Sequence, residues 1–227
     1  SSVWLNAGSS LRYSNQFGKK EREISLVGEA FFEVAKNRSK VFIVHAHDLS
    51  IKAYGTAFNV KSYPEENTVE ATLIEGSIGV NRNGLNRNSK DEIMLEPNQR
   101  VVYYKSSNKT VKEQTEDIES KPETTQPEGS NKQLTYMISR GIDTMPFTSW
   151  KEGTLIISSE TLAELAVKLE RKYDVNIQFE NEALKQIKFS GSLKNETVEQ
   201  VIEAIGIAAH IDYEIEEREI KFKEKTN

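Results

Sequence analysis

The order of apolar and polar residues divides the chain into three stretches. Up to residue 104, short runs alternate between apolar and polar positions, which is the pattern of β-strands with one buried face. We expect strands at 29–35, 41–44, 49–53, 58–63, 69–74, 77–80, 93–95 and 101–104. The run 41–44 is apolar throughout, which is typical of a strand buried on both faces. No part of this stretch has helical periodicity, so residues 1–104 are predicted to form an all-β domain, either a sandwich or a solenoid-like stack.

Two short sequences in this first stretch have the composition of tight turns. Asn83-Gly84 favours a type I′ hairpin between two of the predicted strands. Pro97-Asn98 fits the two central positions of a type II turn, because proline fixes φ and asparagine tolerates a positive φ.

The second stretch, residues 105–147, is polar and weakly patterned. It is rich in Ser, Thr, Glu, Lys and Pro and has too little apolar surface to offset the entropy of ordering, so a linker is predicted. Apolar residues return between Ser139 and Trp150. We expect this lead-in to pack on the domain that follows.

The third stretch, residues 148–227, contains two amphipathic helical patterns. Apolar residues recur at i, i+3, i+4 and i+7 in both 162–169 and 198–205. A threonine precedes each pattern, with Glu or Gln three residues later, which fits the capping box that begins a helix. The two pairs are Thr161 with Glu164 and Thr197 with Gln200.

Short apolar runs flank both helical patterns and read as strands. They are 154–158, 175–179, 188–193, 211–215 and 219–222. The element order is therefore βαβ followed by βαββ. This order predicts a small α+β domain in which each helix lays one apolar stripe on a small sheet.

Composition and charge narrow the function classes. The chain has 227 residues and a formal net charge of −5, with 30 Lys and Arg against 35 Asp and Glu. A net acidic chain without a basic tract is a poor nucleic-acid binder, so no nucleic-acid partner is expected. Cysteine is absent, which excludes disulfides, thiolate metal sites and cysteine nucleophiles. No run approaches the roughly 20 apolar residues that a membrane-spanning helix needs.

Two pairs of side chains are candidates for a chemical site. His45 and His47 would share one face of a strand and could bind zinc, but no third ligand is identifiable. Glu29 and Glu33 are a carboxylate pair, yet four residues on a strand span roughly 13 Å, more than glycosidase mechanisms tolerate. No G-x-S-x-G motif, phosphate loop or dinucleotide motif is present. We therefore expect no catalytic residue, cofactor or metal, and a protein that is not an enzyme.

The first domain resembles the FecR family at four linked motifs. In chain order they are 3–9 (VWLNAGS), 28–35 (GEAFFEVA), 55–60 (GTAFNV) and 75–80 (EGSIGV). The third stretch resembles the small domain that follows FecR in many such proteins, which is similar to the secretin and TonB short amino-terminal fold. The residues that carry this second resemblance are Trp150, Gly153, Leu155, Leu165, Ile177 and the run 169–173.

The resemblance implies a regulatory role. FecR-type proteins cross the inner membrane of Gram-negative bacteria once, and their cytoplasmic part holds or activates an extracytoplasmic-function sigma factor. Their periplasmic part senses a ligand-loaded TonB-dependent outer-membrane transporter. This chain would be the periplasmic part, with the transmembrane helix and the cytoplasmic segment absent from it. Its expected partner is the signalling domain of the transporter.

Recognition of that partner is expected to use backbone pairing at an exposed strand edge, together with apolar side chains. Two edges are candidates, and the alternative that either strand is paired internally stays open. Their candidate partner-binding residues are Val175, Ile177 and Phe179 on one strand, and Glu219, Ile220 and Phe222 on the other.

A second hypothesis is a sensor that binds a glycan or siderophore directly, without a protein partner. Aromatic side chains in the first domain could stack on such a ligand, although packing is the more common fate of aromatics. The candidates are Trp4, Tyr13, Tyr54, Tyr63, Tyr103 and Tyr104.

Overall fold

The computed structural model describes residues 1–19, 22–37, 39–82, 92–105 and 136–225. They belong to two compact units, Ser1–Phe147 and Thr148–Asn227, called unit 1 and unit 2 below. Unit 1 is all-β and unit 2 is α+β, so the predicted fold classes are confirmed. No helix among the described residues is both long and apolar enough to span a membrane.

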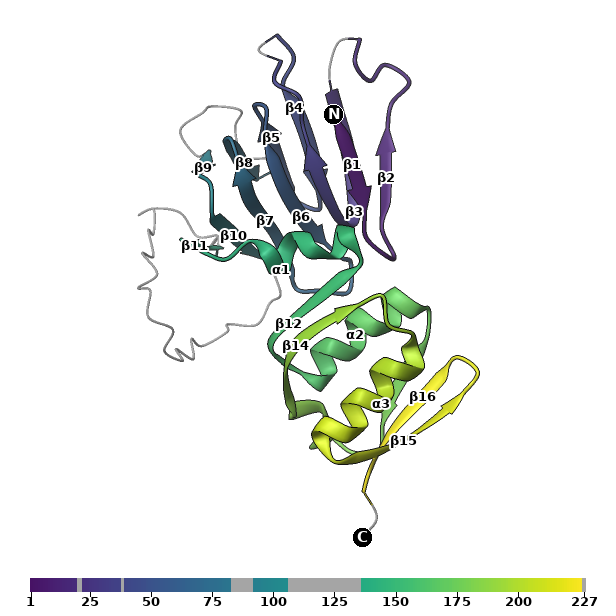
Figure 1. The fold of residues 1–227 in the computed structure, drawn as a ribbon. Coiled ribbons are helices and arrows are strands. Elements are labelled where there is room, and N and C mark those ends of the chain that lie inside the picture. The colour runs from purple at the N-terminus through teal and green to yellow at the C-terminus, as the bar shows by residue number, and fades with distance from the viewer. Residues whose placement is uncertain (20–21, 38, 83–91, 106–135, 226–227) are drawn as a thin grey trace. The chain divides into compact units, whose positions relative to one another are not determined.

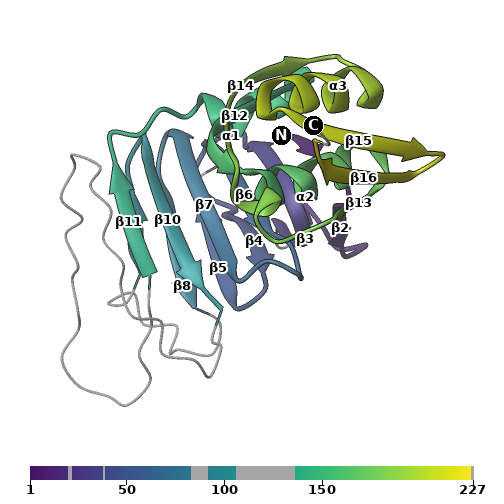
Figure 2. The ribbon, with the colours of Figure 1, turned by 90° about the horizontal axis from the view of Figure 1, so that it is seen from below.

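Unit 1 consists of β-strands that form two layers (Figure 1). The strands are β1 (Ser2–Leu5), β2 (Ser10–Tyr13), β3 (Arg22–Glu33), β4 (Phe42–Ala46), β5 (Leu49–Ala53), β6 (Ala57–Ser62), β7 (Thr68–Glu75), β8 (Ile78–Arg82), β9 (Ile93–Leu95), β10 (Gln99–Tyr104) and β11 (Tyr136–Arg140). Their hydrogen-bonded order is β11-β10-β7-β6-β3-β4-β5-β8-β9, with β1 and β2 both paired to β3. Figure 2 shows β11, β10, β7 and β6 side by side in one layer.

Strand β3 belongs to both layers, because its two halves pair with different strands. Its first half pairs with β2 and β4, and its second half pairs with β1 and β6. The two halves meet at Gly28, whose φ is +97°, a value that favours glycine. A Cβ on Gly28 would lie 2.3 Å from Ser9 Oγ, so the corner also requires the absence of a side chain.

The core of unit 1 lies between the layers. Phe32 and Phe58 stack with ring centroids 5.0 Å apart, and Phe42 lies against Phe32 at 6.1 Å. In β4, Phe42, Val44 and Ala46 are buried, whereas Ile43 is only half-buried. The prediction that this strand is buried on both faces is therefore wrong, since only one of its faces meets the core.

Both turn predictions concern connections within unit 1. Asn98 has a φ of +63°, and the N–H of Gln99 donates to the carbonyl of Glu96 at 3.1 Å, which confirms the turn at Pro97-Asn98. The predicted hairpin partners do pair, as β8 with β9. The Asn83-Gly84 turn itself lies outside the described residues.

The stretch 105–147, predicted as a linker and lead-in, contains a strand that belongs to unit 1. β11 pairs with β10, and Tyr136 and Ile138 pack against the unit 1 core. Period-2 alternation over so few residues, next to a long polar stretch, gave too weak a signal for a strand. Unit 1 thus continues past residue 104 to Phe147, through the short helix α1 (Met145–Thr148), while residues 106–135 lie outside the description.

Unit 2 contains two capped helices and two small sheets. Its elements are η2 (Ser149–Glu152), β12 (Thr154–Thr161), α2 (Leu162–Tyr173), β13 (Asn176–Phe179), η3 (Leu184–Gln186), β14 (Lys188–Lys194), α3 (Val198–Ala209), β15 (Ile211–Glu216) and β16 (Glu219–Glu224). β12 pairs with β14, and β13, β16 and β15 form a second sheet in that order. The single small sheet that was predicted is therefore two sheets.

The predicted helix starts and apolar stripes are confirmed. The N–H of Glu164 donates to Thr161 Oγ1 at 3.3 Å, and the Glu164 carboxylate accepts from the Thr161 N–H at 2.8 Å. Thr197 and Gln200 form the same capping box at 3.4 and 2.9 Å. The apolar stripes supply much of the unit 2 core. Their buried members are Leu162, Leu165, Ala166 and Leu169 on α2, and Val201, Ile202 and Ile205 on α3.

Candidate functional site

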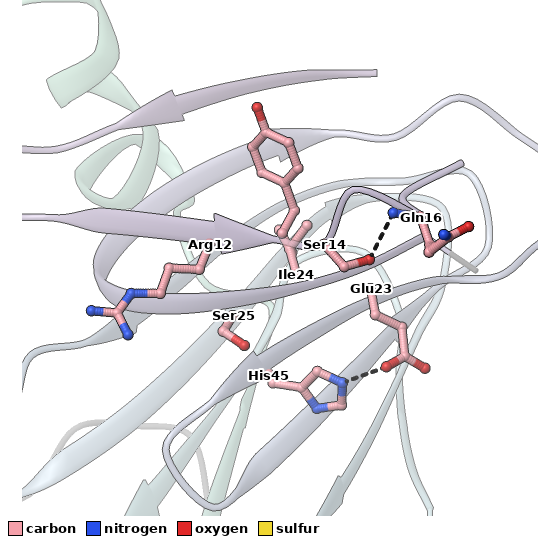
Figure 3. Close-up of a pocket in the computed structure, with 8 residues that line it drawn as sticks. Arg12, Ser14, Gln16, Glu23, Ile24, Ser25 and His45 are labelled. Atoms are coloured by element: carbon pink, nitrogen blue, oxygen red, sulfur yellow. Dashed lines mark hydrogen bonds and ion pairs between the residues drawn. The ribbon is translucent and has the colours of Figure 1, made fainter. Parts of the chain in front are cut away.

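A polar groove lies on the outer surface of unit 1, along strands β2, β3 and β4 (Figure 3). Its volume is about 580 Å³. The strand register places Arg12 beside Ser25, Ser25 beside His45, and His45 beside Ser50, which makes a cross-strand row of polar side chains. The lining residues are Arg12, Tyr13, Ser14, Gln16, Glu23, Ile24, Ser25 and His45.

His45 is the most constrained side chain of this groove. Its Nδ1 lies 2.9 Å from Ser50 Oγ, and its Nε2 lies 3.1 Å from a Glu23 carboxylate oxygen. Both ring nitrogens are therefore engaged, one with Ser50 on β5 and the other with Glu23 on β3.

The Ser50–His45–Glu23 line has the residue types of a catalytic triad but lacks the other requirement for acyl transfer. An oxyanion is stabilised by backbone N–H groups that point at the reacting carbon. β5, which carries Ser50, is paired on both sides, with β4 and with β8, so its backbone N–H groups belong to the sheet. The line orders the surface of the groove and offers no support for hydrolysis.

The histidines considered as a zinc pair do not share a strand face. β4 ends at Ala46, and His47 lies in the following turn with a φ of +51°. Its Nδ1 lies 3.4 Å from Asp48, away from the contacts of His45. In the described ranges, no group of three or more His, Cys, Asp or Glu side chains could hold a metal ion.

Glu29 is a buried carboxyl group at the corner between the layers of unit 1. Its two oxygens accept from the side-chain amides of Asn59 and Asn6, each at 2.7 Å, and its N–H donates to Ser9 Oγ at 2.8 Å. Burial raises the pKa of Glu29, and the two amide hydrogen bonds oppose that rise. Glu33, its candidate catalytic partner, is exposed, so the two carboxyls occupy different environments. These contacts join the β1–β2 connection to β3 and β6, which is a structural role.

The aromatic residues proposed as stacking platforms are dispersed. Tyr63 and Tyr103 are buried, and Trp4 lies against Phe31 with ring centroids 5.7 Å apart. Tyr13 lines the groove and is 68% exposed. Tyr54 and Tyr104 are exposed but do not line it.

One of the two candidate strand edges is not an edge. β16, which carries Glu219, Ile220 and Phe222, is the central strand, paired with β13 on one side and β15 on the other. Ile220 and Phe222 are fully buried, so their apolar character reflects the core. The hypothesis of backbone recognition at this strand is therefore corrected. The period-2 pattern identified a strand but carried no information on its place in the sheet.

The other candidate strand, β13, is a true edge whose outer side is partly used. The N–H of Ile177 donates to the Glu170 carboxylate at 2.8 Å, so a side chain of α2 already satisfies it. Ile177 is buried, and Phe179 stacks on Phe222 with ring centroids 5.9 Å apart. Val175 precedes the strand and packs partly buried against the core. Partner binding by Val175, Ile177 and Phe179 stays a prediction.

Comparison with protein families gives two matches. The family model described as FecR protein matches residues 1–79, and the model described as FecR, C-terminal matches residues 154–222. No curated protein matches the sequence.

Comparison with solved structures finds the same fold in a bacterial protein. Two crystal structures, at 1.65 and 2.50 Å resolution, are of a chain assigned as an anti-sigma factor from Parabacteroides distasonis ATCC 8503. Each superposes with a TM-score of 0.73 at 24% sequence identity, over 99% of this chain and 90% of that chain. At this identity the likeness concerns the fold.

Proposed function

Because the chain belongs to the FecR family, we propose that it is the periplasmic sensor part of a sigma-factor regulator. It receives its signal by binding the signalling domain of a ligand-loaded TonB-dependent outer-membrane transporter. The sigma factor would be reached through a cytoplasmic segment and a helix that crosses the inner membrane.

The observation that carries this proposal is the pair of family matches, one on each unit. The geometry supports binding rather than chemistry. Both carboxyl oxygens of Glu29 already accept hydrogen bonds inside unit 1. β5, which carries Ser50, is paired on both sides, so its backbone N–H groups are not available as oxyanion donors. Unit 2 has its own core and unpaired strand edges, which are the features of a module that recognises another protein by strand addition.

A binding measurement tests the proposal. The full chain and the fragment 148–227 are each titrated with the purified signalling domain of the cognate transporter in a calorimeter. We expect saturable binding to the full chain, retained by the fragment. The signalling domain of an unrelated transporter is the control, and it should not bind. Absence of binding to both the full chain and the fragment would overturn the proposed function.

A second candidate function is direct binding of a glycan or siderophore. The groove of Figure 3 favours it, because its lining includes the polar side chains of Arg12, Glu23 and His45 and also the exposed Tyr13. Thermal-shift screening of the full chain against sugars and siderophores tests this candidate. A rise in the melting temperature of unit 1 that Arg12→Ala abolishes would support it, and no shift with any compound would count against it.

A further inference from the structure

The outer side of β15 is a strand edge of unit 2 that lies outside the two candidate strands. β15 and β16 form a hairpin that closes with Glu216 opposite Glu219, so alternate residues of β15 direct their backbone groups away from β16. With a two-residue turn these are Ile211, Tyr213 and Ile215. Beyond the pairing with β16, neither Tyr213 nor Ile215 makes a hydrogen bond to another described residue.

The other strand edges of unit 2 carry features that discourage pairing. The outward N–H of Ile177 on β13 is taken by Glu170. β12 has an irregular register between Ile157 and Glu160. β14 begins and ends with lysine, a residue that protects exposed edges. The stretch Tyr213–Ile215, called the β15 edge below, has none of these features.

Helix α3 presents an apolar surface next to this edge. Figure 2 shows β15 between α3 and β16. The ring of Tyr213 approaches Gly206 so closely that a Cβ there would lie 3.0 Å from it. Around the helix from Gly206, Ile202 and Ile205 are buried on one side, while Glu203 and Ile207 are exposed on the other. A strand added to the β15 edge would therefore place its inward side chains beside Ile207.

Ile207 is 70% exposed, the largest exposed fraction among the big apolar side chains of the described residues. Ala204 and Ala208 share its side of the helix and are also exposed. α3 therefore has a second apolar surface in addition to the stripe that packs in the core. Exposed apolar surface of this kind marks an interaction site when a specific partner can be argued for it.

The charges around the edge specify the partner. The side chains of β15 that alternate with Tyr213 and Ile215 are all acidic and exposed, namely Asp212, Glu214 and Glu216, and of these Glu214 forms an ion pair with Lys223 of β16. The hairpin turn adds Glu217, and α3 adds Glu203. Two copies of this strand side by side would place like charges together, which disfavours a second copy of the chain. The same charges favour a strand whose outward side chains are Lys or Arg.

We propose that the β15 edge accepts an extended strand of a partner protein with apolar inward and basic outward side chains. The strand pairs with the backbone of Tyr213 and Ile215, and its apolar residues cover Ile207. This proposal rests on the proposed function for the source of the strand, which is the signalling domain of the transporter.

The first test uses a synthetic probe and the full chain labelled with nitrogen-15. The probe is a seven-residue peptide that alternates Lys with Val or Ile. We expect the amide signals of Tyr213 and Ile215 to shift and to gain protection from hydrogen exchange. A peptide with Glu in place of Lys should bind at least about tenfold more weakly. Shifts confined to other parts of the chain, or equal binding of the two peptides, would overturn the proposal.

Substitutions test the apolar contact separately. Ile207→Asp should weaken binding of the basic peptide about tenfold, because a charge replaces the exposed anchor. Val167→Asp is the matched control, since Val167 is a partly exposed apolar residue on the other helix, at 37%. Both side chains are exposed, Ile207 more than Val167, so we expect both variants to fold, and their melting temperatures check this. Equal peptide binding by the Ile207→Asp variant and the control would overturn the proposal.

Two outcomes separate this inference from the proposed function. If the transporter domain binds the full chain and its affinity is unchanged by Ile207→Asp, the β15 edge is wrong while the proposed function stands. If the domain does not bind but the basic peptide protects Tyr213 and Ile215, the edge stands while its source is wrong. A dimer of the chain that Ile207→Asp dissociates would identify a second copy as the occupant and overturn the proposal.

Discussion

The two units differ in how much of their structure the local sequence specifies. In unit 1 the strands that pair are often remote in sequence, as Gly28 with Ser62 between β3 and β6, or Val101 with Ile138 between β10 and β11. In unit 2 each helix lies between neighbouring strands and begins with its own capping box. Unit 2 also pairs strands that are remote in sequence, as Thr154 with Lys194. Its two helices are specified by the local sequence, whereas unit 1 depends mainly on strand register.

The two units also differ in what they leave exposed. Unit 1 draws a carboxyl group, two amides and a hydroxyl into the corner around Glu29, where the carboxyl accepts from both amides and the hydroxyl accepts from the Glu29 N–H. Unit 2 leaves Ile207 and the β15 edge open to solvent. Under the proposed function, this difference suits unit 1 to a scaffold role and unit 2 to recognition.

The largest expected effects come from removing one core side chain in each unit. Phe32→Ala in unit 1 should lower the free energy of unfolding by about 3–5 kcal/mol and Leu169→Ala in unit 2 by about 2–5 kcal/mol, because both side chains are fully buried. Trp4 and Trp150 report on the two units by fluorescence during urea unfolding. Each substitution should shift the transition of its own unit. If Phe32→Ala shifts both transitions equally, the units unfold as one and the comparison fails.

The corner of unit 1 is tested by two glycines with the same kind of φ. Gly28 and Gly18 have φ values of +97° and +81°, but a Cβ would collide with Ser9 only at Gly28. Gly18→Ala should cost about 1–3 kcal/mol of unfolding free energy from backbone strain. Gly28→Ala should cost clearly more, since the strain and the collision add. Equal urea midpoints for the two variants would show that the approach of Ser9 to Gly28 does not limit the fold.

The capping boxes of unit 2 should contribute less. Thr197→Ala removes the acceptor for the N–H of Gln200 and should lower the unfolding free energy of unit 2 by about 1 kcal/mol. The matched change Thr161→Ala should give a loss of similar size on α2. Urea unfolding followed at Trp150 measures both. A loss for one threonine only would mean that the two helices do not contribute alike.

The smallest expected effect is a change in the pH dependence of unit 1. Burial raises the pKa of Glu29 above its ordinary value of 4.5, so the folded state holds this proton more tightly than the unfolded state. The stability from this group is present at pH below 4.5 and is lost as pH rises through the raised pKa. Glu29→Gln should remove that loss. Melting temperatures from pH 4 upward compare the two proteins, and parallel curves would contradict the assignment.

The helices of unit 2 could be predicted from the sequence, but which strands lie at the edges of either unit could not. The stripes from Leu162 and Val198 and both capping boxes follow from spacing alone, because a helix is a local structure. The all-β character of unit 1 followed from alternation in the same way. β11 was missed, since its few alternating residues gain their place only by pairing with a strand on the far side of a polar stretch.

The candidate site was harder to predict for a related reason. The sequence pattern places His45 and His47 on one strand face, but the strand ends at Ala46. The same kind of pattern predicts Phe222 on an edge strand, but β16 lies between two other strands. In each case the residue type was identified correctly and its neighbours were not. Ile207 could be recognised in the sequence only as an apolar residue outside the α3 stripe. Its proposed role follows only from the structure, which places the helix beside β15.

The pairing of β11 with β10 has a mechanical consequence. Arg140, the last residue of β11, pairs with Gln99, and the chain leads from there through α1 into unit 2. A pull exerted on unit 2 would first load the hydrogen bond from the Ile142 N–H to the Asn98 carbonyl, and then this residue pair. It would then open the ladder one pair at a time toward Tyr103 and Tyr136, as a zipper opens. Tension applied through unit 2 would thus load β11, the outermost strand of this sheet, before the other strands of unit 1.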